Sequence, residues 1–181
     1  MVGRAVRGLS KRPYVFTKCS LVWDGSGARA VAVAPITSLQ PPYSLLATAV
    51  EHSIFHFTMR QQIGVIVYSP MASGLLSGAM TRERIAARPE DDWRKRSANF
   101  REPALTSNLR LLEALRAIGQ RYNSTPGAVA IAWTLRNPAV TGAIVDIRRA
   151  QRVDGVIVAA EMELDSTDLL EIEQTMPLQV A

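Results

Sequence analysis

Short apolar runs rich in β-branched residues recur along this chain, and they alternate with segments of helical pattern. The runs cover residues 12 to 18, 31 to 40, 64 to 70 and 141 to 147. Strands that are apolar on both faces are typical of parallel sheets, in which helices cover the outside. Helical patterns lie at residues 44 to 62, 108 to 122, 125 to 137 and 166 to 175. This alternation predicts an α/β fold built from right-handed strand-helix-strand units.

Two of the predicted helices carry start signals. Thr125 is expected to be an N-cap and Pro126 the first helical residue, where the missing N–H costs nothing. The stretch DSTDLLEIEQ offers capping residues and acids at the amino end of the last helix. Between residues 77 and 106 the chain is charged and irregular, which predicts a partly helical excursion from the sheet. Loops of that length are often functional.

Length and composition exclude several classes of protein. A closed eight-stranded β/α barrel takes ~250 residues and rarely fewer than ~200, so a barrel in this chain of 181 residues has to be incomplete. The formal charge is +5, but no stretch of basic residues is interleaved with aromatic residues, which argues against a nucleic-acid partner. Cys19 is the only cysteine, which agrees with a reducing compartment. No apolar run reaches the ~18 residues of a membrane span, so we expect a cytoplasmic protein.

Four stretches follow one another in a specific order. They are SLQPPYSLL, GVIVYSPMASGLLSG, TPGAVAIAWTLRNPAV and GAIVDIRRAQRVDGV. In order and approximate spacing they resemble the carboxy-terminal half of the aldo-keto reductases, NADP(H)-dependent enzymes with a TIM-barrel fold. The resemblance covers residues 36 to 175 nearly continuously. Residues 2 to 23 also resemble the third barrel strand of the family with the end of its preceding helix.

The resemblance implies one aldo-keto reductase-like domain over residues 1 to 181. Its fold would be a partial (β/α)8 TIM barrel with parallel strands and outer helices. The family's strands between the two matching blocks are missing, so the resemblance implies an internal deletion, and Met1 would start partway along the family's second helix. Such a deletion leaves sheet edges unpaired, and unpaired apolar edges favour association. We therefore expect self-association.

The resemblance also implies a cofactor, NADP(H), and the residues that bind it. The loop from Ser69 to Leu75 would lie along the pyrophosphate, where small residues expose backbone N–H groups and hydroxyls. Tyr68 would stack on the nicotinamide, Gln40 would hydrogen-bond its carboxamide, and Arg148 would bind the adenosine 2′-phosphate. The full set of expected cofactor residues is Gln40, Tyr68, Ser69, Met71, Ser73, Gly74, Leu75 and Arg148.

For catalysis, the resemblance implies reduction of a small carbonyl substrate and assigns Lys18 to the family's lysine. The family's aspartate and proton-donating tyrosine would precede Met1, and its histidine would fall in the deleted segment. Asp146 stands where many members have a glycine, and a carboxylate near phosphate is repulsive. Two hypotheses therefore stay open. One is an NADPH-dependent aldehyde or ketone reductase, and the other is a non-catalytic relative that binds at most a dinucleotide or an anion.

Two further patterns favour structural roles. His52 and His56 have a spacing that can hold zinc, but no third ligand or intervening glutamate accompanies them, so we expect two exposed imidazoles and no metal site. Trp133 and Trp93 are interpreted as anchors of the core and of the excursion, respectively.

Overall fold

The computed structural model describes residues 36–147 and 153–177. The chain divides into two compact units, Met1–Thr37 and Ser38–Ala181, and all the elements below belong to the second. The strand expected at residues 12 to 18 lies outside the described residues, as do Lys18 and Arg148.

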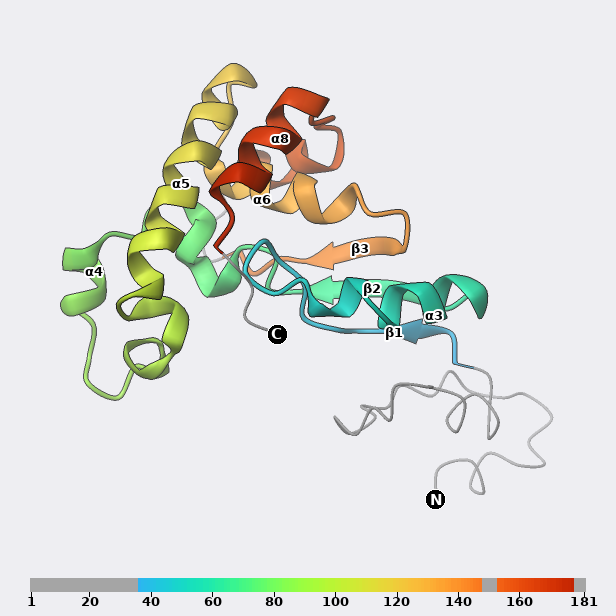
Figure 1. Ribbon diagram of the computed structural model, residues 1–181, viewed down its shortest axis with the longest axis horizontal. Coiled ribbons are helices and arrows are strands. Elements are labelled where there is room, and N and C mark those ends of the chain that lie inside the picture. The colour runs from blue at the N-terminus through green and yellow to red at the C-terminus, as the bar shows by residue number, and fades with distance from the viewer. Residues whose placement is uncertain (1–35, 148–152, 178–181) are drawn as a thin grey trace. The chain divides into compact units, whose positions relative to one another are not determined.

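A parallel sheet forms the centre of the second unit (Figure 1). Its strands are β1 (Ser38–Leu39), β2 (Gly64–Tyr68) and β3 (Val140–Ile144), in the spatial order β1-β2-β3. Both pairings are parallel, and the register sets Tyr68 beside Ile144. The expected strands at 64 to 70 and 141 to 147 are therefore confirmed as parallel neighbours. Of the run at 31 to 40, only the part from residue 36 onward is described, and it contributes the short strand β1.

Helices follow each strand. The α-helices are α3 (Ile54–Arg60), α4 (Arg82–Ala86), α5 (Ala104–Arg121), α6 (Pro126–Leu135), α7 (Asp154–Ile157) and α8 (Ser166–Thr175). Short 3-10 segments are η1 (Ala49–Glu51), η2 (Ala72–Ser77), η3 (Trp93–Arg96), η4 (Ala98–Phe100) and η6 (Val158–Ala160). Among the described helices, none combines the length and apolar character that crossing a bilayer requires.

The start signals read from the sequence correspond to real caps. The Thr125 side chain accepts a hydrogen bond from the Ala128 amide at 3.2 Å, and α6 begins at Pro126. Helix α8 starts at Ser166 with a complete capping box, in which the side chains of Asp165 and Asp168 each accept a bond from the other residue's amide. Both signals are local to the sequence, which is why the predicted starts were accurate.

The prediction of a single helix over residues 44 to 62 was wrong. Only α3 and the short η1 form there, because the backbone before them is held by the sheet and by a tight turn. Pro42 forms a parallel bridge with Tyr68, and the Tyr43 amide donates to the Tyr68 carbonyl at 3.2 Å. Ser44 and Ala47 then exchange backbone hydrogen bonds. These pairings direct residues 42 to 47 across the end of β2.

The main core lies between one face of the sheet and the helices. Val65 and Val67 on β2 are fully buried, together with residues of α5, α6 and α8 such as Leu111, Val129 and Ile172. The other face of β2 carries side chains that remain exposed, because strand residues alternate between faces. The described residues therefore cover one face of the sheet and leave the other open.

The expected excursion between β2 and α5 is confirmed as partly helical. It contains α4, η3 and η4 and encloses a second small core of five buried residues. These are Leu75, Met80, Ile85, Phe100 and Leu105. The excursion therefore packs on its own apolar centre, which holds residues 93 to 100 beside the loop that follows β2.

Candidate functional site

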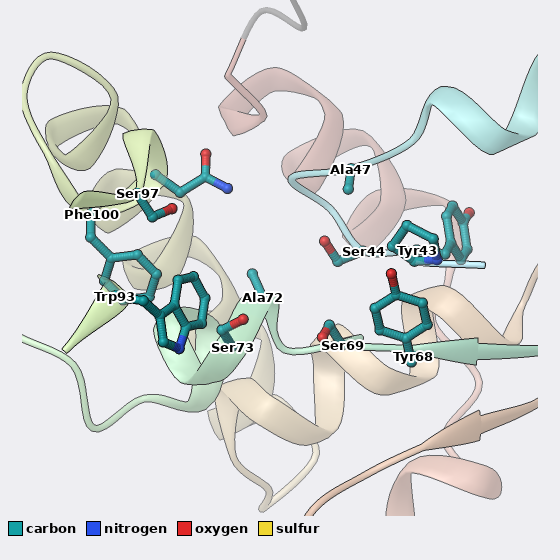
Figure 2. A pocket seen from close by; sticks show the side chains of 12 residues that line it. Tyr43, Ser44, Ala47, Tyr68, Ser69, Ala72, Ser73, Trp93, Ser97 and Phe100 are labelled. Carbon is teal, nitrogen blue, oxygen red and sulfur yellow. The ribbon is translucent and has the colours of Figure 1, made fainter. Parts of the chain in front are cut away.

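A pocket of about 230 Å³ lies where β1 and β2 end and the excursion begins. One wall is the turn after β1, with Tyr43 and Ser44, and another is the end of β2 with its loop. Figure 2 shows the third wall, where Trp93 and Ser97 of the excursion lie across from Tyr68. Parallel strands end at the same edge of a sheet, and ligands of α/β folds bind at that carboxyl edge.

The loop after β2 has a backbone that few residues adopt. Ser69, Ala72, Ser73 and Gly74 have φ of 57°, 48°, 57° and 91°. Inside the loop, the amides of Ala72 and Gly74 donate to the carbonyls of Ser69 and Met71 at 2.9 and 3.0 Å. Positive φ at several non-glycine residues is costly and is retained mainly at functional sites. Successive residues of this kind form a tight cradle that presents small side chains to the pocket.

The described lining of the pocket is more apolar than polar, and it contains serines and Asn99 but no charged residue. The hydroxyls of Ser69, Ser73 and Ser97 have no hydrogen-bond partner among the described residues, whereas Ser44 accepts a bond from the Leu46 amide. Unpartnered hydroxyls at a concave surface are free to bind a ligand that has hydroxyls or phosphate oxygens. The lining therefore suits a polar, oxygen-rich group.

Aromatic side chains lie at both ends of the pocket (Figure 2). Tyr68 is 38% exposed at the last position of β2, where its ring can stack on a planar ligand. Tyr43 is buried, and its hydroxyl donates to Glu51. Burial, reinforced by the hydrogen bond and charge of Glu51, raises the pKa of Tyr43 far above its usual value, so this phenol stays protonated.

The structure brings only part of the expected cofactor set to the pocket. Tyr68, Ser69 and Ser73 line it, whereas Gln40 is exposed after β1 and is not in the lining. Met71 packs toward α6, its sulfur 3.0 Å from where a Cβ on Gly127 would lie. Three of these five expected residues therefore face the pocket, and Gln40 and Met71 do not line it.

Leu75 ends the loop that was expected to follow the pyrophosphate. It is fully buried in the second core, so its side chain shapes the loop and presents no surface to a cofactor. Gly74 is beside it in a left-handed conformation, and a Cβ there would meet nothing within 4 Å. Gly74 is therefore required by its φ and not by lack of space.

Sequence reasoning missed the third wall of the pocket. Trp93 was expected to anchor the excursion, yet it is 52% exposed and lines the pocket with Ser97, Asn99 and Phe100. The length of the excursion was the only signal in the sequence, because the contact depends on how residues 93 to 100 fold back.

No metal centre is formed by the described residues. His52 and His56 are both exposed, and His52 lies before α3 while His56 lies within it. Trp133 is buried in the main core as expected, with the Arg136 guanidinium 4.5 Å from its ring centroid.

Comparison with known proteins places these features in context. Residues 17–176 match the model of the aldo/keto reductase family. The chain is similar to probable aldo-keto reductase 1 of Glycine max, with 27% identity over 83% of this chain and 42% of that protein. It is also similar to the aldo-keto reductase yakc [NADP(+)] of Schizosaccharomyces pombe, with 25% identity over 81% of this chain and 43% of that protein. The chain thus spans less than half the length of these curated relatives.

A solved structure gives the fold. The glycerol dehydrogenase AKR11B4 from Gluconobacter oxydans superposes with a TM-score of 0.74 and 23% identity, over 83% of this chain and 47% of that chain. The described sheet and helices are accordingly part of a (β/α)8 barrel, which confirms the expected fold class.

Proposed function

Because this chain belongs to the aldo/keto reductase family, we propose that its pocket binds the nicotinamide and pyrophosphate part of NADP(H). On this proposal the chain is an oxidoreductase of the aldo-keto reductase type that reduces a small aldehyde or ketone. The observation that carries the proposal is the set of unpartnered hydroxyls of Ser69, Ser73 and Ser97 around a neutral pocket at the carboxyl edge of the sheet.

The residues present fit such a cofactor. Ser69 and Ser73 offer hydroxyl donors to pyrophosphate oxygens from a cradle of positive φ. Tyr68 offers a ring face to the nicotinamide, and Gln40, one strand away, offers an amide to its carboxamide. Met71, which packs toward α6, and Leu75, which is buried in the second core, support the cradle. Gly74 allows the kink inside η2 that directly follows Ser73.

The charged part of the cofactor requires residues beyond the described lining. We assign the adenosine 2′-phosphate to Arg148, because a guanidinium can form two parallel hydrogen bonds to a phosphate. This assignment favours NADP over NAD. The printed name of the fission yeast relative, with NADP(+), supports the same choice.

Bound NADPH would supply a hydride to the carbonyl carbon of the substrate. The residues of this chain would hold the dinucleotide, orient its nicotinamide against Tyr68 and exclude water with the aromatic ends of the pocket. Lys18 is the catalytic residue that we propose, on its match to the family's lysine: its ammonium would lower the pKa of the acid or water that delivers the proton to the carbonyl oxygen. Tyr43 is unsuited to be that donor, because its hydroxyl is committed to Glu51.

A titration of NADPH fluorescence tests cofactor binding. We expect the Ser69→Ala/Ser73→Ala variant to lose about tenfold in affinity, which corresponds to ~1.4 kcal/mol. Ser107→Ala is the matched control, because Ser107 is exposed on α5 and distant in sequence from the loop. Equal NADPH affinity in the double variant and in the unsubstituted chain would contradict the proposal that Ser69 and Ser73 bind the pyrophosphate.

Turnover separates the two candidate functions. The alternative is a chain that binds a dinucleotide without catalysis, and it is favoured by Tyr43, a tyrosine of the pocket whose hydroxyl is bonded to Glu51. NADPH oxidation is followed with nitrobenzaldehyde, and a rate above that of Lys18→Ala supports the reductase. NADPH binding without such turnover supports the alternative.

A further inference from the structure

The wall of the pocket contributed by the excursion is held by one aromatic pair. The ring of Trp93 packs edge-on against Phe100, with centroids 6.3 Å apart and planes at 76°. Phe100 belongs to the second core, so Trp93 is supported on one side and open to the pocket on the other (Figure 2). The guanidinium of Arg94 lies 5.8 Å from the Trp93 ring centroid.

A single carboxylate fixes the chain on which Trp93 lies. Asp92 accepts hydrogen bonds from the Arg88 Nη1 at 2.7 Å and from the Arg94 amide and Nε, both at 3.0 Å. Its side chain is only 13% exposed. Asp92 is also the N-cap of η3, the segment that begins at Trp93. Asp92 thus joins Arg88, just after α4, to Arg94, the residue that follows Trp93.

Arg88 depends on this carboxylate. Its Nε is buried without a hydrogen-bond partner, and its Nη2 contacts only the sulfur of Met80, at 3.8 Å. Removing the negative charge of Asp92 would leave the Arg88 guanidinium without its ionic partner among the described residues. The arginine and the η3 backbone would then rearrange together.

We propose that Asp92 is a positioning residue for ligand binding: by holding Arg88 and Arg94 it keeps the Trp93 indole at the pocket wall, where the indole contacts the bound dinucleotide. The inference rests on the proposed function for the identity of the ligand. The neighbouring acid Glu90 serves as the comparison: its ion pair within the described part of the chain is with Lys95, and at 93% exposure that pair holds η3 weakly.

Asp92→Asn and Trp93→Ala should each weaken NADPH binding about tenfold, and the double variant should bind as the weaker single variant does, because both changes remove the same contact. Glu90→Gln should change the affinity less than about twofold, as is usual for an exposed ion pair. Asp92→Glu tests rescue by a residue that keeps the charge.

Ligand-free measurements on the full chain test the positioning role separately. Asp92→Asn should increase acrylamide quenching of Trp93, obtained as the difference from the same chain with Trp93→Phe. It should also speed amide hydrogen exchange in residues 93 to 100 while leaving exchange in α5 and α6 unchanged. Glu90→Gln should change neither quantity.

Each failure has a distinct meaning. Unchanged quenching and exchange in Asp92→Asn would overturn the positioning role whatever the cofactor does. Affinity losses of Asp92→Asn and Trp93→Ala that simply add would overturn the shared contact. An unsubstituted chain that does not bind NADPH would overturn the proposed function and the ligand contact of Trp93, while the ligand-free measurements would still decide how Trp93 is held.

Discussion

Substitution of Asp168 is predicted to be the most damaging single change in the interface between α5 and α8. The Asp168 side chain is 2% exposed and accepts hydrogen bonds from Arg121 Nη2 at 2.5 Å, from the Tyr122 hydroxyl and from the Asp165 amide. It therefore closes the capping box of α8 and joins that helix to the end of α5. Asp168→Asn keeps the shape of the side chain and removes its charge.

The size of the effect follows from these contacts. A hydrogen bond to a charged group contributes ~1.5–3 kcal/mol, and a helix cap contributes ~1 kcal/mol. Two features reduce the loss: Arg121 is 45% exposed and keeps Glu171 as a partner at 2.9 Å, and the Tyr122 hydroxyl lies 3.1 Å from the Glu163 carbonyl. We therefore expect Asp168→Asn to lower the free energy of unfolding by about 2–3 kcal/mol.

Urea denaturation followed by circular dichroism measures this loss. For a small domain the slope is ~1–3 kcal/mol per molar, so the midpoint should fall by about 1 M. Glu171→Gln is the matched control, because Glu171 also pairs with Arg121 but at the surface, where an ion pair contributes less than ~1 kcal/mol. Equal losses in the two variants, or a loss below ~0.5 kcal/mol in Asp168→Asn, would refute the reasoning.

Three further outcomes are expected. Burial alone would raise the pKa of Asp168, but hydrogen bonds from Tyr122 and Arg121 outweigh burial and hold this pKa below its usual value. The free energy of unfolding should therefore fall as the pH drops below about 4. An equally large fall of this free energy in Asp168→Asn would contradict the prediction. Thr125→Val should cost about 1 kcal/mol in a urea melt by removing the cap of α6, and Thr125→Ser should restore it. We also propose that the open sheet face with Ile66 and Ile144 drives self-association. A monomer in light scattering at micromolar concentration would contradict this proposal.

Local signals made parts of the fold predictable. The start of α8 depends on Asp165 and Asp168, three residues apart, and the start of α6 depends on Thr125 and the proline after it. The apolar run of β2 is long enough and β-branched enough to mark a buried strand on its own. In each case the residues that decide the structure are near neighbours in the sequence, so no knowledge of the tertiary fold is needed.

Contacts distant in sequence explain the failures. Leu45 fits the apolar stripe of a helix, and it is indeed buried, but it lies in a turn because Pro42 and Tyr43 pair with the end of β2. Trp93 is exposed to the pocket only because Phe100 is anchored in the second core. Neither pairing leaves a periodic pattern in the sequence, and so the turn and the third wall could be found only from the structure.

The described lining of the pocket holds no charged residue, so the charge that would attract a cofactor's phosphates has to come from outside this lining. A pyrophosphate carries negative charge, yet the described lining offers it hydroxyls and no cation. Two arginines of the excursion, Arg88 and Arg94, are already paired with Asp92. On the proposed function, Arg148 would attract the phosphates, while the serine cradle would orient them. On this division, loss of Arg148 weakens binding in a salt-dependent way, because screening acts on charges, and loss of the serines weakens it equally at low and high salt.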